Sequence, residues 1–99
     1  MFIAILDLHT TPTDRAAALA QLDREHDEIR TMPGNLDFRV YADRDSEGDV
    51  TVIHEWVDEP SFAAYLASPT FARSGEVIRP LMSEPSVSRR FHADLLESV

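Results

Sequence analysis

Residues 52–71 read VIHEWVDEPSFAAYLASPTF, and they decide the fold because a strand pattern gives way to a helix pattern within them. The strand pattern covers VTVIHEWV, residues 50–57, in which successive side chains point to opposite faces. Val52, His54 and Trp56 therefore share one face. A histidine and the single tryptophan on an otherwise apolar face are either ordinary core or the wall of a pocket.

The helix pattern begins immediately after this strand. Asp58 is a suitable N-cap residue, and Phe62 and Tyr65 have the spacing of one helix face. Ser68 and the proline that follows it predict the start of a further helix, which runs to about Leu81. We expect the inner residues of this last helix to be Phe71, Val77 or Ile78, and Leu81.

The segments before this stretch supply two more strands and a long helix. Residues 2–8 predict a strand, and residues 36–43 alternate as a second strand that pairs with residues 50–57 in an antiparallel hairpin. Between them, a helix is expected to begin at a Thr13 N-cap and to end at the Pro33-Gly34 step.

The long helix has an apolar stripe and an acidic face. Leu19, Leu22, His26 and Ile29 recur at intervals of three and four residues, and we expect them to be buried. The acidic run DREHDE, residues 23–28, is interpreted as a solvated face.

A last strand over residues 86–92 completes the order β-α-β-β-α-β, which is typical of ferredoxin-like domains. We therefore predict one α+β domain over residues 1–99, a four-stranded antiparallel sheet with helices on one face. The opposite face is too apolar for a normal solvated surface, so we expect a second copy to cover it. That face would carry Arg39, Tyr41, Thr51, Ile53 and Val57.

Composition excludes many classes of function. A net charge of −9 disfavours nucleic acids and anionic membranes as partners. Without cysteine or lysine there is no thiolate chemistry and no Schiff base, and three glycines cannot build a dinucleotide-binding loop. The N-terminus has only a six-residue apolar run with no basic residue before it, so we expect a cytoplasmic protein without a signal sequence or a membrane helix.

Three segments, PGNLDFRVYADRD, IHEWVDEPSFAAYLASPTF and RPLMSEPSVSRRF, together resemble the antibiotic biosynthesis monooxygenase (ABM) domain of the dimeric α+β barrel superfamily. The resemblance rests on a Pro-Gly step before the second strand, a tryptophan ending the third, an acidic helix cap, a Ser-Pro-x-Phe step and a Pro-Leu pair. It implies a homodimer whose sheets pack face to face into a barrel. It also implies a pocket between sheet and helices in each subunit.

The same resemblance offers two activities. Some members are monooxygenases that oxidise quinols or polyketide phenols without metal or flavin, and others degrade haem. The haem-degrading branch uses a helix histidine and a strand asparagine, but Tyr65 and Asp7 stand at or near those places here. A glutamate that often precedes the tryptophan by two residues is His54 in this chain.

We therefore expect a cofactor-independent and metal-free oxygenase acting on a small quinol-like or polyketide aromatic. His54 is the candidate base, Trp56 a flat wall with an N–H donor, and Tyr65 a hydroxyl donor. The alternatives are that these three residues are ordinary core, that the dimer binds a ligand without catalysis, or that it binds haem through Tyr65. The residues expected to contact the substrate are Phe38, Val52, Phe62, Phe71 and Arg89.

Overall fold

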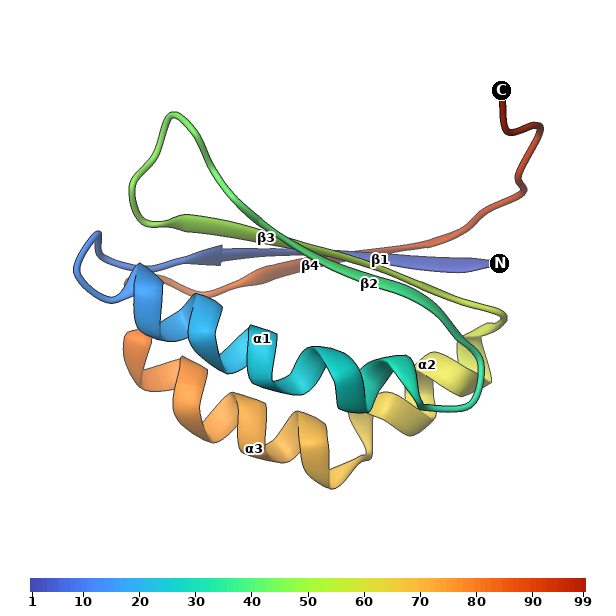
Figure 1. The fold of residues 1–99 in the computed structure, drawn as a ribbon, viewed down its shortest axis with the longest axis horizontal. Helices are drawn as coiled ribbons and strands as arrows, with labels where there is room; N and C mark the ends of the chain where they lie inside the picture. Colours follow the sequence, from blue (N-terminus) through green and yellow to red (C-terminus); the bar gives the residue numbers. More distant parts are fainter.

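The computed structural model describes all residues 1–99 and contains four strands and three α-helices. The sheet has the order β2-β3-β1-β4 with every pair antiparallel, and the helices all lie on one side of it (Figure 1). This confirms the predicted ferredoxin-like α+β fold. The elements are β1 Phe2–His9, α1 Arg15–Arg30, β2 Asn35–Ala42, β3 Asp49–Trp56, α2 Glu59–Leu66, α3 Pro69–Ile78, a 3₁₀ turn Arg79–Leu81, and β4 Val87–His92.

The two short helices begin at the predicted caps. The carboxylate of Asp58 accepts a hydrogen bond from the backbone N–H of Ser61 at 2.9 Å, and the Ser68 hydroxyl accepts one from the N–H of Phe71 at 3.2 Å. The last helix is shorter than expected and tightens into a 3₁₀ turn, because Pro80 has no N–H to continue the α-helical ladder.

Helix α1 differs from the prediction at its start and on its buried side. Its N-cap is Asp14 rather than Thr13, and no side chain caps it. Its buried face includes Glu25, which is 4% exposed, whereas the side chain of His26 is 46% exposed. The prediction that His26 is buried was therefore wrong, and the acidic run is not solvated throughout.

The sheet register sets the residues of the inner face opposite one another. His54 on β3 lies opposite Ala4 on β1 and Phe38 on β2, and Ala4 also lies opposite Arg90 on β4. The core between this face and the helices includes the fully buried Trp56. The inner face is therefore a row of side chains that runs across the sheet beneath the helices.

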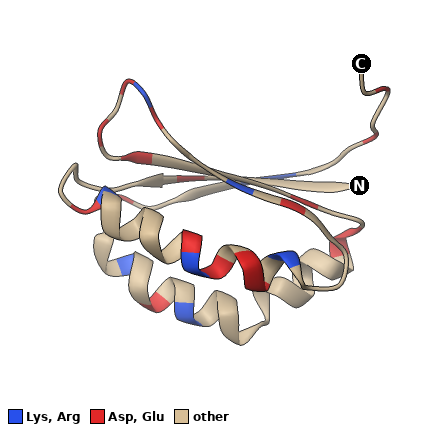
Figure 2. Cartoon of the chain, viewed as in Figure 1, with Lys and Arg blue, Asp and Glu red and all other residues tan.

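The outer face of the sheet is open to solvent in the single chain. Tyr41, Val87 and Phe91 are 44%, 51% and 44% exposed there, beside the half-buried Ile5 and Ile53. None of the three helices is long and apolar enough to cross a membrane. Acidic side chains are spread along α1 and the loop between β2 and β3 (Figure 2).

Candidate functional site

A cavity of about 300 Å³ lies between the inner face of the sheet and the helices, a volume at the lower end for small-molecule sites. Most of the side chains that line it are hydrophobic. The lining residues Phe71, Arg79 and Arg90 are themselves exposed, so they mark where the cavity meets solvent. Phe38, Val52 and Phe62, expected to contact a substrate, also line it, as does Phe71.

His54 is the centre of an aromatic cluster that forms one wall of this cavity. The centroid of its ring lies 5.5 Å from those of Phe38 and Phe62 and 5.6 Å from that of Tyr65. The strand pattern and the helix pattern read from residues 52–71 do bring His54 and Tyr65 together. The site is therefore built by packing α2 against β3.

The hydrogen bond between Trp56 and His54 determines which tautomer the neutral imidazole adopts. The indole Nε1–H donates to Nδ1 of His54 at 3.0 Å, so Nδ1 carries the lone pair and the proton of the neutral ring sits on Nε2. Burial, and to a smaller extent the charge of Arg90, lower the pKa of His54 from 6.5 to about 4. At neutral pH the imidazole is therefore uncharged and has one N–H to donate.

Nε2 of His54 is available to a ligand. It makes no hydrogen bond within the chain, and Oε2 of Glu25 is the only fully enclosed side-chain polar atom without a partner. Since His54 lines the cavity, its Nε2–H is open to that space. Trp56 does not line the cavity; it is fully buried behind His54 and orients it.

Tyr65 also lines the cavity, and its hydroxyl keeps its proton. Its ring stacks on Trp56 with centroids 5.4 Å apart. Burial, and then the nearby Glu25 carboxylate, raise the pKa of the Tyr65 hydroxyl well above its ordinary value. The hydroxyl has no hydrogen-bond partner in the chain, so it too is a free donor.

Arg89 does not reach the cavity. It lies opposite Ile5 on the outer face, where its guanidinium is 3.6 Å from the carboxylate of Asp7. Its neighbour Arg90 lines the cavity instead. A shift of one residue along a strand reverses the face, and no turn connects β4 to a neighbour closely enough to set its register from the sequence.

Glu25 was also missed by sequence reasoning. Its Oε1 accepts a hydrogen bond from the Gln21 amide at 2.8 Å, while its buried Oε2 has no partner. Burial raises its pKa, and the Gln21 amide and the Ser74 hydroxyl oppose this effect.

Nowhere in the chain do three His, Asp or Glu side chains gather closely enough to hold a metal ion.

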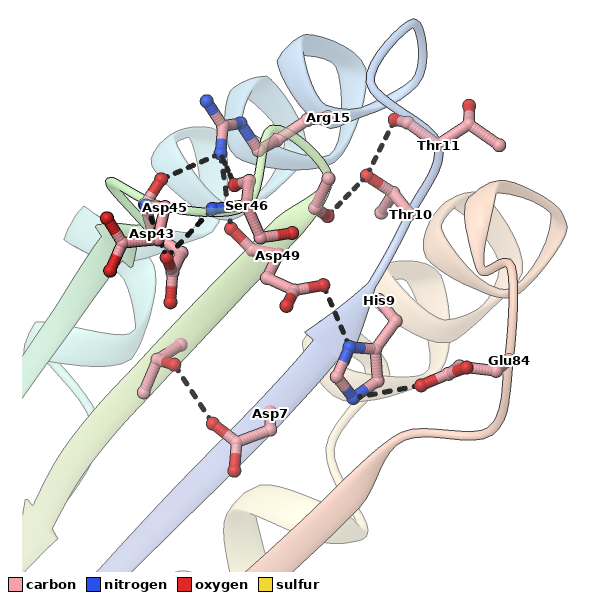
Figure 3. A network of polar contacts seen from close by, with 12 residues as sticks. Asp7, His9, Thr10, Thr11, Arg15, Asp43, Asp45, Ser46, Asp49 and Glu84 are labelled. Atoms are coloured by element: carbon pink, nitrogen blue, oxygen red, sulfur yellow. Dashed lines mark hydrogen bonds and ion pairs between the residues drawn. The ribbon is translucent and has the colours of Figure 1, made fainter.

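A polar network joins the segment before β4 to strands β1 and β3 (Figure 3). The His9 ring lies between two carboxylates, with Nδ1 2.8 Å from Asp49 and Nε2 3.3 Å from Glu84. The backbone N–H of Ser83 donates to the carbonyl of His9 at 2.7 Å. These contacts hold the segment before β4, which contributes Met82 to the lining.

Comparison with known proteins identifies one family. The model of the family described as "Antibiotic biosynthesis monooxygenase" matches residues 1–76. Among solved structures, a Deinococcus radiodurans protein that carries the same family name is 17% identical, with a TM-score of 0.91 over 100% of this chain and 98% of that one. A conserved protein of unknown function from Bacteroides thetaiotaomicron is 13% identical, with a TM-score of 0.84 over 91% of this chain and 94% of that one. At these identities the structures show a shared fold, and no protein with a curated description matches the chain.

Proposed function

Because the chain belongs to the antibiotic biosynthesis monooxygenase family, we propose that it is a cofactor-independent monooxygenase that oxidises a quinol-like or polyketide aromatic in the cavity between sheet and helices. The observation that carries this proposal is the pairing of an uncharged His54, whose Nε2–H is free, with an aromatic-lined cavity. Such a site accommodates an aromatic ring and offers a donor to one of its oxygens.

The proposed reaction uses the substrate as its own reductant. A phenol or anthrone-type substrate loses a proton, and the resulting anion passes one electron to O₂. The substrate radical and superoxide then join at carbon, a proton completes a hydroperoxide, and loss of water leaves a carbonyl. For an anthrone CH₂ group the sum is CH₂ + O₂ → C=O + H₂O, with all four electrons supplied by the substrate.

His54 and Tyr65 act in this proposal as donors that stabilise the substrate anion. Both groups keep their protons at neutral pH, His54 on Nε2 and Tyr65 on its hydroxyl. Each donor that reaches the substrate oxygen lowers the pKa of the bound phenol, and the proton of the phenol passes to water. The low pKa of His54 and the occupation of its Nδ1 by Trp56 favour this role over the base role expected from the sequence.

The proposal includes a homodimer formed through the outer face of the sheet. The exposed Tyr41, Val87 and Phe91 support it, because the solvated face of an antiparallel sheet normally carries polar side chains. The cavity lies on the other side of the sheet, so each subunit would keep its own site.

The test is oxygen uptake by the metal-free protein with naphthalene-1,4-diol and anthrone, against their autoxidation without protein. We expect His54→Leu to slow uptake roughly 100-fold or more, because it removes one oxyanion donor. His54→Gln should retain more activity, since an amide N–H can replace Nε2–H. Glu55→Gln is the control, because Glu55 is not among the cavity residues. Equal uptake by wild type and His54→Leu would refute the proposed role of His54.

A ligand-binding dimer without catalysis is the second candidate. It is favoured by the absence of any carboxylate from the cavity wall, since His54 with a pKa of about 4 is then the only side-chain base there. Saturable binding of these aromatics without enzyme-dependent oxygen uptake would establish this function in place of the oxygenase.

A further inference from the structure

Two arginines bring an unbalanced positive charge to the cavity. Arg79 and Arg90 line it, and no aspartate or glutamate does. The chain as a whole has the opposite balance, with 18 acidic residues and 9 basic ones. The cavity wall is therefore positively charged although the net charge of the chain is negative.

Neither of these two guanidinium groups forms an ion pair, whereas three arginines elsewhere in the chain do. Arg39, Arg73 and Arg89 lie within 2.6, 3.1 and 3.6 Å of carboxylate oxygens, respectively. Arg79 and Arg90 have no carboxylate partner. Their charges therefore remain free for a ligand.

Each arginine packs against another residue of the cavity lining. The guanidinium carbon of Arg90 lies 4.9 Å from the centroid of the Phe62 ring, and its Nε donates to the Ser88 hydroxyl at 3.3 Å. Arg79 lies along α3 over Gly75, where a Cβ would collide with the guanidinium. Both Gly75 and Ser88 line the cavity as well.

We propose that the ligand of this cavity is an aromatic carboxylate, whose carboxylate is bound by Arg79 and Arg90 at the solvent side while its ring system lies against Phe62 and His54. The guanidinium fork matches a carboxylate with two parallel hydrogen bonds. Both arginines are exposed and the aromatic wall is buried, so the anionic group stays near water and the ring enters the apolar interior. This inference uses the cavity of the proposed function and specifies the class of its substrate.

Binding of two uncomplicated probes tests the inference. 2-Naphthoate and 2-naphthamide have nearly the same shape, differ in charge, and have no hydroxyl to react with O₂. We expect calorimetric titration to show 2-naphthoate binding about tenfold more tightly or better, because a charge-assisted pair exceeds a neutral one. Raising the salt concentration should reduce this preference.

Variants locate the source of the preference. In Arg79→Met/Arg90→Met, which keeps the aliphatic stems, the two probes should bind about equally. Arg89→Met is the matched control, because Arg89 is adjacent in sequence but lies on the outer face, and it should retain the preference. Thermal unfolding of each variant checks that the fold is intact.

The outcomes separate this inference from the proposed function. Equal binding of the two probes to the wild type, a preference that survives the double substitution, or no saturable binding of 2-naphthoate would each overturn the carboxylate site. A preference that depends on the two arginines, in a protein that consumes no oxygen with any aromatic tested, would support the carboxylate site and refute the oxygenase.

Discussion

The imidazole of His54 is kept uncharged by burial, and this makes the stability of the protein depend on pH. Its pKa is about 4 in the folded chain and 6.5 ordinarily, so between these values the unfolded chain takes up a proton that the folded chain does not. Acidification through this window should cost on the order of 3 kcal/mol of folding free energy.

His54→Gln removes this ionisation and isolates its effect. We expect the unfolding free energy of the wild type to fall more steeply than that of the variant between pH 6.5 and pH 4. Urea denaturation at pH 4, 5, 6 and 7 measures both curves. Parallel curves would mean that His54 has the same pKa in the folded and unfolded chains, and would refute the burial-lowered pKa on which its role as a neutral donor is based.

Glu25 should have the opposite dependence on pH. Its pKa is raised by burial, so the folded chain holds this proton more tightly, and the stability that the neutral carboxyl provides below pH 4.5 is lost as the pH rises through the raised pKa. Glu25→Gln cannot ionise and keeps an acceptor for the Gln21 amide.

The variant should therefore be more stable than the wild type at pH 7, and the gain should shrink toward pH 4. Melting temperatures at pH 4, 5.5 and 7 measure the difference. Glu28→Gln serves as a contrast, because the Thr70 hydroxyl, and then Arg73, lower the pKa of Glu28. A Glu25→Gln variant that is less stable at pH 7 would show that the charged carboxylate is favourable in its place.

At the scale of elements, Gly34 couples the start of β2 to helix α2. Its φ of +82° suits glycine, and a Cβ there would meet the Ser61 hydroxyl and lie 2.9 Å from a methyl group of Val57. Gly34→Ala should destabilise the fold by about 3 kcal/mol, from backbone strain and the displaced contact together. Urea denaturation measures this cost, and a loss below about 1 kcal/mol would show that the turn relaxes freely.

The same element scale shows what the sequence could predict. The caps at Asp58 and Ser68 were predicted correctly because each depends on a few neighbouring residues. The stripe of α1 was not, since both 22-25-29 and 22-26-29 satisfy helical spacing, and the charge of Glu25 argued for exposure. Only the packing of α1 against both the sheet and α3 distinguishes these alternatives.

For the candidate site, too, the sequence predicted what depends on local pattern and missed what depends on long-range packing. His54 and Tyr65 share a wall of the cavity because each lies on a locally determined face. That Trp56 lies behind His54 rather than in the cavity depends on side-chain orientation, and the choice between Arg89 and Arg90 depends on long-range register. Neither can be read from local periodicity.

At the scale of the whole molecule, the open face of the sheet predicts association. This face exposes Tyr41, Val87 and Phe91 beside the half-buried Ile5 and Ile53, and apolar side chains left in water favour association. We expect sedimentation equilibrium at about 20 μM to give twice the chain mass of 11.2 kDa.

Phe91→Glu should shift this equilibrium to the monomer, because it places a charge on the outer face of the sheet. Phe91 lies on the edge strand β4 and its side chain is already 44% exposed, so its loss should cost the core little. Ala20→Glu adds the same charge to an exposed position on α1 and should leave the dimer intact. Loss of the dimer in both variants would indicate general repulsion between acidic chains, and its retention in Phe91→Glu would mean that the subunits associate through another surface. A monomeric Phe91→Glu that still binds 2-naphthoate would show in addition that each cavity is complete within one chain.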